Sequence, residues 1–197
     1  MSELICVTNR RLCAEDFLVR LKKIAEAKPG AVVLREKDLS GEEYLRLARQ
    51  AKIICEQSGT RLILHNFSDV AAELGADSLH LPLPKLRELT ASQRGNFKAL
   101  GTSCHSVEDV IEAQIIGCTY VFAGHIFETD CKRGIKGRGL ELLSEVCARA
   151  EIPVYAIGGI SPQNYKSVIA AGASGACVMS GFMRCESPLE YIKTFSE

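Results

Sequence analysis

The segment from Tyr120 to Gly139 combines the residue types of a catalytic loop. Four apolar residues, from Tyr120 to Ala123, are followed directly by Gly124 and His125. Residues 126–139 then bring basic side chains and three further glycines. An apolar run that ends at Gly-His predicts a buried strand leading into a mobile loop, and loops held by a rigid scaffold carry much of enzyme chemistry. His125 is therefore the first candidate catalytic residue.

Polar residues also stand at the ends of other apolar runs. Arg35-Glu36-Lys37 follows one run, and Ser103 lies at the end of another. Two later runs end at Gly158-Gly159 and at Met179-Ser180-Gly181, each directly before a helix-like segment. Exposed backbone N–H groups at the start of a helix bind phosphate, so these two turns form a candidate phosphate site. Tight turns alone would also explain the glycines.

The apolar runs alternate with helix-like segments along the chain. One such segment begins at Ser40 with Glu43 at the capping-box position, another begins at Ser106, and a short one is expected from Leu86 to Arg94. Eight strand-helix units with near-continuous apolar strands predict one α/β domain over residues 1–197, a (β/α)8 TIM barrel with its site at the carboxyl ends of the strands. A doubly wound open sheet is the alternative, because periodicity does not show whether the sheet closes.

Composition narrows the class of protein. Twenty-four Lys and Arg balance 24 Asp and Glu, so no broad basic surface for nucleic acid or anionic lipid is expected. No membrane-spanning run or secretory signal is recognised, which predicts a soluble cytoplasmic protein. Nine cysteines, an odd number without a Cys-x-x-Cys pair, favour reduced core thiols over disulfides or zinc. Cys131 is the exception, because Lys132 and Arg133 beside it would stabilise a thiolate; an incidental loop residue is the simpler interpretation.

Six motifs, taken together and in order, resemble the thiamine phosphate synthase/TenI family. The motifs are VVLREKDL (Val32 to Leu39), ELGADSLHL (Glu73 to Leu81), GTSCHS (Gly101 to Ser106), GHIFETDCKRGIKGRG (Gly124 to Gly139), AIGGI (Ala156 to Ile160) and VMSG (Val178 to Gly181). The resemblance covers nearly the whole chain and implies a TIM barrel, in agreement with the count of strand-helix units. It also implies a small thiazole phosphate as the substrate.

Synthases of this family join a pyrimidine diphosphate to a thiazole phosphate. The resemblance implies that they hold Mg²⁺ with aspartates in an Asn-Asp-Arg motif after the third strand and a Gly-Gln-x-Asp motif after the fourth. The matching positions here are His65-Asn66-Phe67 and Pro82-Leu83-Pro84-Lys85, so both aspartates are missing. Because Mg²⁺ prefers carboxylate oxygens and Lys85 would repel it, we expect no metal and no cofactor.

The loop after the sixth run instead resembles the TenI-type thiazole tautomerases, which carry Gly-His-x-Phe-Glu-Thr-Asp. Those enzymes aromatise a carboxythiazole phosphate by moving a proton, and one imidazole can remove and return it. On this resemblance we expect an isomerase of thiamine biosynthesis with His125 as the catalytic proton shuttle. The alternatives are a thiamine phosphate synthase with an altered metal site, and a non-catalytic barrel that binds a phosphate ligand as a regulator.

The other site residues are expected to bind the substrate. The amides around Gly158, Gly159, Ser180 and Gly181, beside Met179, would hold the phosphate, with Ser103 and Thr129 donating hydrogen bonds to the carboxylate. Arg35 and Lys37 would orient anionic groups, or form a structural ion-pair ring with Glu36, an alternative of equal weight. His65, His80 and His105 are interpreted as structural residues. The loop over residues 128–138 has the glycines of a lid, and a homodimer without nucleic-acid or membrane partners is expected.

Overall fold

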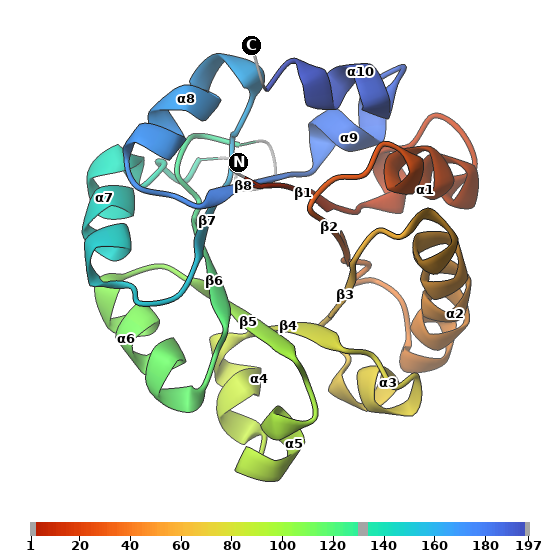
Figure 1. Cartoon of the computed structure of the whole chain (residues 1–197), viewed down its shortest axis with the longest axis horizontal. Helices are drawn as coiled ribbons and strands as arrows, with labels where there is room; N and C mark the ends of the chain where they lie inside the picture. Colours follow the sequence, from red (N-terminus) through yellow and green to blue (C-terminus); the bar gives the residue numbers. More distant parts are fainter. Residues whose placement is uncertain (1–2, 130–133, 196–197) are drawn as a thin grey trace.

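A computed structural model of the chain describes residues 3–129 and 134–195. Eight parallel strands form a closed barrel in sequence order, with β1 paired to both β2 and β8 (Figure 1). The strands are β1 (Glu3–Val7), β2 (Ala31–Leu34), β3 (Leu62–His65), β4 (Ser78–Pro82), β5 (Ala99–Cys104), β6 (Tyr120–Gly124), β7 (Val154–Ile157) and β8 (Gly175–Val178). The predicted (β/α)8 TIM barrel is thus confirmed, and the open sheet is excluded.

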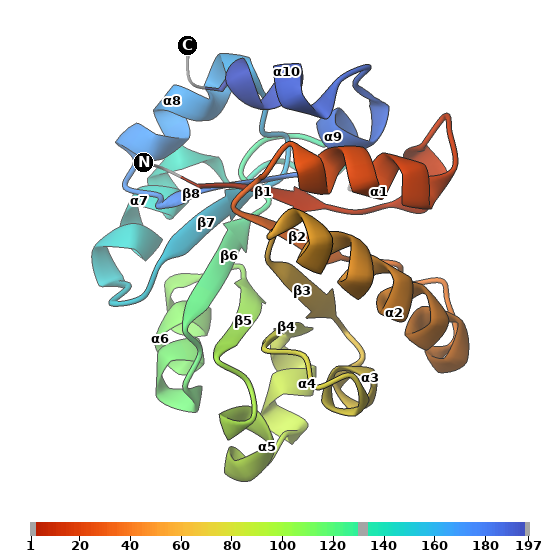
Figure 2. The same ribbon diagram turned by 45° about the vertical axis from the view of Figure 1, so that its right-hand side comes forward.

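Helices surround the strands on the outside of the barrel (Figure 2). They are α1 (Phe17–Glu26), α2 (Gly41–Ser58), α3 (Ser68–Glu73), α4 (Leu83–Glu88), α5 (Ala91–Gly95), α6 (Val107–Ile116), α7 (Gly139–Arg149), α8 (Pro162–Ala170), α9 (Ser180–Arg184) and α10 (Pro188–Lys193), with a 3-10 turn η1 (Arg10–Leu12) after β1. In the described part of the chain, no helix has the length and apolar character needed to cross a bilayer.

Local sequence signals account for where most helices begin. Ser40 and Glu43 form the predicted capping box of α2, and the Ser106 hydroxyl accepts from the backbone N–H of Asp109 at the start of α6. The single helix expected from Leu86 to Arg94 is wrong. The chain forms α4 and α5 instead, because Thr90 and Gln93 make a second capping box that starts a new helix.

The core has two layers, set by the alternation of side chains along each strand. Outward residues such as Leu4, Val32 and Leu64 pack against the helices. Inward residues fill the barrel, among them Ile5, Val33, Ile63, Tyr120 and Phe122. Because both faces of every strand are buried, the strands read as the continuous apolar runs seen in the sequence.

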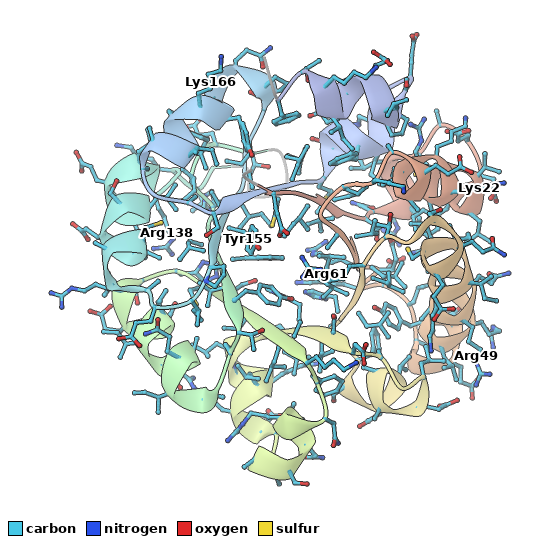
Figure 3. All side chains as sticks on the ribbon, viewed as in Figure 1. Lys22, Arg49, Arg61, Arg138, Tyr155 and Lys166 are labelled. Carbon is cyan, nitrogen blue, oxygen red and sulfur yellow. The ribbon has the colours of Figure 1, made fainter. Side chains whose placement is uncertain are left out.

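Polar contacts close the barrel at the amino-terminal ends of the strands. The Tyr155 hydroxyl donates to the Glu3 carboxylate at 2.7 Å, and Arg61 pairs with the same carboxylate at 3.2 Å. Figure 3 shows Tyr155 and Arg61 inside the ring of strands. This end of the barrel is therefore blocked, which leaves the carboxyl ends as the place for a site.

The cysteines of the described chain are all unpaired. Five of the eight are buried, and the thiol pKa of Cys55 is raised to about 12 by burial. This agrees with the prediction of reduced core thiols. The suggested reactive residue, Cys131, lies outside the described residues.

Candidate functional site

A cavity of about 310 Å³ opens at the carboxyl ends of the strands, and all eight strands or the loops directly after them contribute to its wall. This volume suits a small ligand. The predicted site residues that line the cavity are Arg35, Lys37, Ser103, His125, Thr129, Gly158, Gly159, Met179 and Ser180. The barrel thus brings together residues that are far apart in the sequence, as the topology predicted.

Gly181 is the one predicted site residue that does not belong to the cavity wall. A β-carbon at this position would lie 1.9 Å from the hydroxyl oxygen of Tyr191. Glycine is needed there so that Tyr191 of α10 can pack against α9. The glycine after β8 therefore has a packing reason, whereas Ser180 beside it lines the cavity.

The four histidines of the chain all line the cavity. His65 is buried, and burial, followed by the charges of Arg35, Lys37 and Lys85, lowers its pKa to about 3. Sequence reasoning treated every histidine except His125 as structural. Their shared signal is position, because each lies within two residues of the carboxyl end of a strand. Because the pKa of His65 lies far below neutral, this imidazole is uncharged at neutral pH.

His80 forms the floor of the cavity. Its Nε2 lies 2.9 Å from Oγ of Ser103, its Nδ1 lies 3.3 Å from the Tyr120 hydroxyl, and its ring stacks on Phe122 with 4.2 Å between centroids. Complete burial, with a smaller effect from His65, places its pKa well below the usual value. His80 is thus hydrogen-bonded, as predicted, and it is also uncharged; its contact with Ser103 holds that hydroxyl in place.

His125 is buried where β6 meets the following loop. Its Nε2 lies 3.2 Å from the carbonyl oxygen of Ile135, while its buried Nδ1 has no partner among the described residues. Since a carbonyl only accepts, Nε2 carries a proton and donates it in this contact. The backbone N–H of Arg138 also donates to the His125 carbonyl at 3.0 Å. His125 therefore ties the far end of the loop back to β6.

Two consecutive glycines after β7 make room for this arrangement. Gly158 has φ +100°, and a β-carbon there would lie 2.3 Å from Cβ of His125. Gly159 has φ +66°, and a β-carbon there would lie 2.4 Å from the carbonyl oxygen of Glu128. The pair is thus required for the close approach of the loop after β6, whatever ligand its amides bind.

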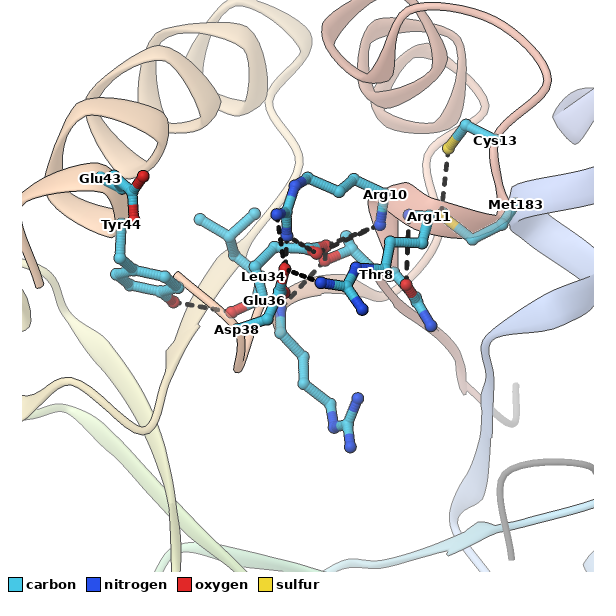
Figure 4. Close-up of polar contacts among 12 residues, drawn as sticks. Thr8, Arg10, Arg11, Cys13, Leu34, Glu36, Asp38, Glu43, Tyr44 and Met183 are labelled. Atoms are coloured by element: carbon cyan, nitrogen blue, oxygen red, sulfur yellow. Dashed lines mark hydrogen bonds and ion pairs between the residues drawn. The ribbon is translucent and has the colours of Figure 1, made fainter. Parts of the chain in front are cut away.

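The carboxyl ends of β1 and β2 are joined by a charged network that is shown in Figure 4. Glu36 is buried and accepts hydrogen bonds from the Thr8 hydroxyl at 2.7 Å and from Arg10. Arg10 also pairs with Asp38 at 2.6 Å, which holds the pKa of the Asp38 carboxyl well below its usual range. Glu36 therefore forms an ion pair with Arg10, which links the ends of β1 and β2.

The donor set around the cavity does not fit Mg²⁺. None of the described residues in the cavity wall is an aspartate or a glutamate. The nearby carboxylates of Glu36 and Asp38 are both engaged by arginine. At the end of β3, the Lys85 ammonium donates to the carbonyl oxygen of Asn66 at 3.4 Å. Mg²⁺ usually takes one or two carboxylates among its oxygen ligands, and the described wall of the cavity offers no carboxylate.

Comparisons with known proteins identify the family. Residues 4–182 match the sequence pattern of the family described as Thiamine monophosphate synthase. The chain is 35% identical over 192 residues to the thiamine-phosphate synthase of Clostridium acetobutylicum, which covers 93% of this chain and 88% of that protein. It is 38% identical over 161 residues to the thiamine-phosphate synthase of Chlorobium luteolum, and the match covers 81% of this chain and 76% of that protein. The chain therefore belongs to the thiamine monophosphate synthase family.

A solved structure supports the same assignment. The thiamine phosphate pyrophosphorylase from Pyrococcus furiosus superimposes with a TM-score of 0.84 at 26% identity, covering 98% of this chain and 93% of that one. The barrel is therefore the fold of this family.

The expectation of an isomerase is wrong. The matched relatives are named as synthases, which are transferases, and none of those cited is named as a tautomerase. The expectation relied on the Gly-His motif and on the missing aspartates. In the structure, His125 has a second explanation that needs no proton transfer, because it anchors the loop after β6 through Ile135.

Proposed function

We propose that the chain catalyses the condensation of a thiamine-phosphate synthase, joining a pyrimidine diphosphate to a thiazole phosphate. The observation that carries the proposal is that one cavity, in a chain of this family, is lined both by cationic side chains and by a pair of glycines after β7, two groups suited to bind anions. Arg35 and Lys37 after β2 provide cationic side chains. Gly158, Gly159 and Ser180 after β7 and β8 provide backbone N–H groups. One region suits the diphosphate, and the other suits the thiazole phosphate.

The reaction needs one bond to form and one to break. The lone pair of the thiazole nitrogen forms a bond to the methylene carbon of the pyrimidine, while the bond from that carbon to the diphosphate oxygen breaks. The electron pair leaves with the pyrophosphate, so no oxidant or proton donor is consumed. Arg35 and Lys37 stabilise the charge that grows on the leaving group.

The middle of the cavity suits the cation that the condensation creates. Phe122 and Ile157 contribute apolar surface, which keeps water away from the reacting carbon. His65 and His80 are buried and uncharged at neutral pH, so they do not repel the thiazolium ring. The Ser103 hydroxyl is held in place by His80 and is available to orient a ring substituent.

The proposal is tested by mixing the two precursors with the protein and measuring thiamine phosphate by chromatography and pyrophosphate by release assay. We expect both products in equal amounts, and a large loss of rate in Arg35→Gln. Arg49→Gln is the matched control, because Arg49 lies on α2 and pairs with Glu73 at the surface. Binding of the thiazole phosphate without any product would overturn the synthase and favour the regulator.

A further inference from the structure

The diphosphate region of the cavity carries charge of one sign. Arg35 and Lys37 line it, and Lys85 on α4 lies beside the end of β3, where its ammonium contacts the Asn66 carbonyl at 3.4 Å. The charges of all three side chains contribute to the lowered pKa of the buried His65 imidazole, so all three lie within electrostatic range of the end of β3. Three cations are thus gathered around the ends of β2, β3 and β4.

The carboxylates closest to this region cannot offset that charge or hold a metal ion. Glu36 is not part of the cavity wall, and its oxygens accept from Thr8 and from the backbone and side chain of Arg10. Asp38 is held by Arg10 at 2.6 Å and by Arg11 at 2.8 Å. Within the described ranges, no cluster of three or more His, Cys, Asp or Glu could bind a metal. A divalent cation would therefore be repelled and would lack carboxylate ligands.

We propose that this protein binds the diphosphate of its substrate without a divalent cation, with Lys85 joining Arg35 and Lys37 as the fixed counter-charge. The inference rests on the proposed function, and it assigns Lys85 a role in anion binding. An ammonium near the ends of β3 and β4 provides directly the positive charge that a metal ion would bring. Because Lys85 is exposed, it can turn from the Asn66 carbonyl to a bound phosphate oxygen.

The direct test is calorimetric titration of inorganic pyrophosphate into the protein at constant ionic strength, in EDTA and then in Mg²⁺. We expect pyrophosphate to bind in EDTA and to bind more weakly when Mg²⁺ is added, because Mg²⁺ neutralises part of the negative charge of pyrophosphate. Lys85→Gln should weaken the binding in EDTA by about tenfold, as expected for one charge-assisted contact. Lys98→Gln is the matched control, because Lys98 pairs with Asp77 at the opposite end of the barrel. Binding that requires Mg²⁺ would overturn the proposal.

A second variant keeps the test decisive. The double variant Asn66→Asp/Lys85→Asp places a carboxylate at each of these two neighbouring positions. Asn66 has φ +73°, a backbone conformation that Asp also tolerates. With folding checked by circular dichroism, pyrophosphate binding should now require Mg²⁺. If it stays independent of Mg²⁺ at the wild-type affinity, Lys85 and Asn66 do not decide the metal requirement, and the inference fails. Neither titration depends on turnover, so a failed condensation assay leaves the result interpretable.

Discussion

The Thr8 hydroxyl lies 2.7 Å from the Glu36 carboxylate, and both residues are buried at the carboxyl ends of neighbouring strands. The same hydroxyl oxygen accepts from the backbone N–H of Arg35 at 2.9 Å. One side chain directly after β1 therefore fixes the backbone that carries the cationic residues of the cavity. The charged network at this edge links β1 to β2 and supports the backbone of the proposed diphosphate region.

Thr8→Val should destabilise the protein by about 1–3 kcal/mol, because Glu36 and the Arg35 N–H each lose a buried hydrogen-bond partner while the side-chain volume is kept. Urea unfolding measures the loss. Thr194→Val is the control, because the Thr194 hydroxyl makes an exposed bond within α10 and its turn. Equal losses of unfolding free energy in the two variants would show that the buried Thr8 contacts stabilise the fold no more than an exposed hydrogen bond does.

His65 should make the stability depend on pH. Its pKa is about 3 in the folded protein against 6.5 when unfolded, so the unfolded state binds the proton more readily between these values. Stability is complete above pH 6.5 and falls as the pH is lowered toward 3. Between pH 6.5 and pH 5 the loss from this group is about 2 kcal/mol. Urea unfolding across this range should show a smaller loss in His65→Asn. Identical pH profiles would contradict the assignment.

His125→Asn should loosen the loop after β6 while leaving the proposed condensation active. The shorter side chain cannot reach the Ile135 carbonyl, and the reaction as written needs no imidazole to move a proton. Faster tryptic cleavage after Lys136 or Arg138 would report the loosening. A loss of turnover at unchanged cleavage rate would instead assign His125 a chemical role.

The fold was predictable because each of its determinants is local. Apolar runs such as Tyr120 to Ala123 mark strands within one residue of β6, and capping boxes such as that of Ser40 mark where helices start. The break between α4 and α5 was missed although its signal, Thr90 with Gln93, was present in the sequence. Closure of the barrel followed from the number of units, since eight parallel strands with helices between them favour it.

The site was predictable in position and less so in chemistry. Barrel topology places strand ends together, so most of the residues named in advance line the cavity, with Gly181 as the exception. Partners that meet across loops could not be predicted from the sequence. Examples are Arg10 for Glu36 and the Ile135 carbonyl for His125. A histidine that anchors a loop and a histidine that moves a proton have the same sequence signal, which is why the predicted reaction was wrong.

Gly158→Ala is expected to cost about 2–4 kcal/mol, because it combines a left-handed backbone conformation with overpacking. Gly158 has φ +100°, and the new methyl group would lie 2.3 Å from Cβ and 2.7 Å from Cα of His125, so the backbone of the loop must shift.

Gly41→Ala is the matched control for Gly158→Ala. Gly41 opens α2 with no atom within 4 Å of the added carbon, and alanine there should stabilise by up to about 1 kcal/mol. Urea unfolding compares the two substitutions directly, and tryptic cleavage of the loop should rise only in Gly158→Ala. A small loss of unfolding free energy in Gly158→Ala would mean that the loop after β6 adjusts freely. The close contact between Gly158 and His125 would then have no role in holding the cavity wall in place.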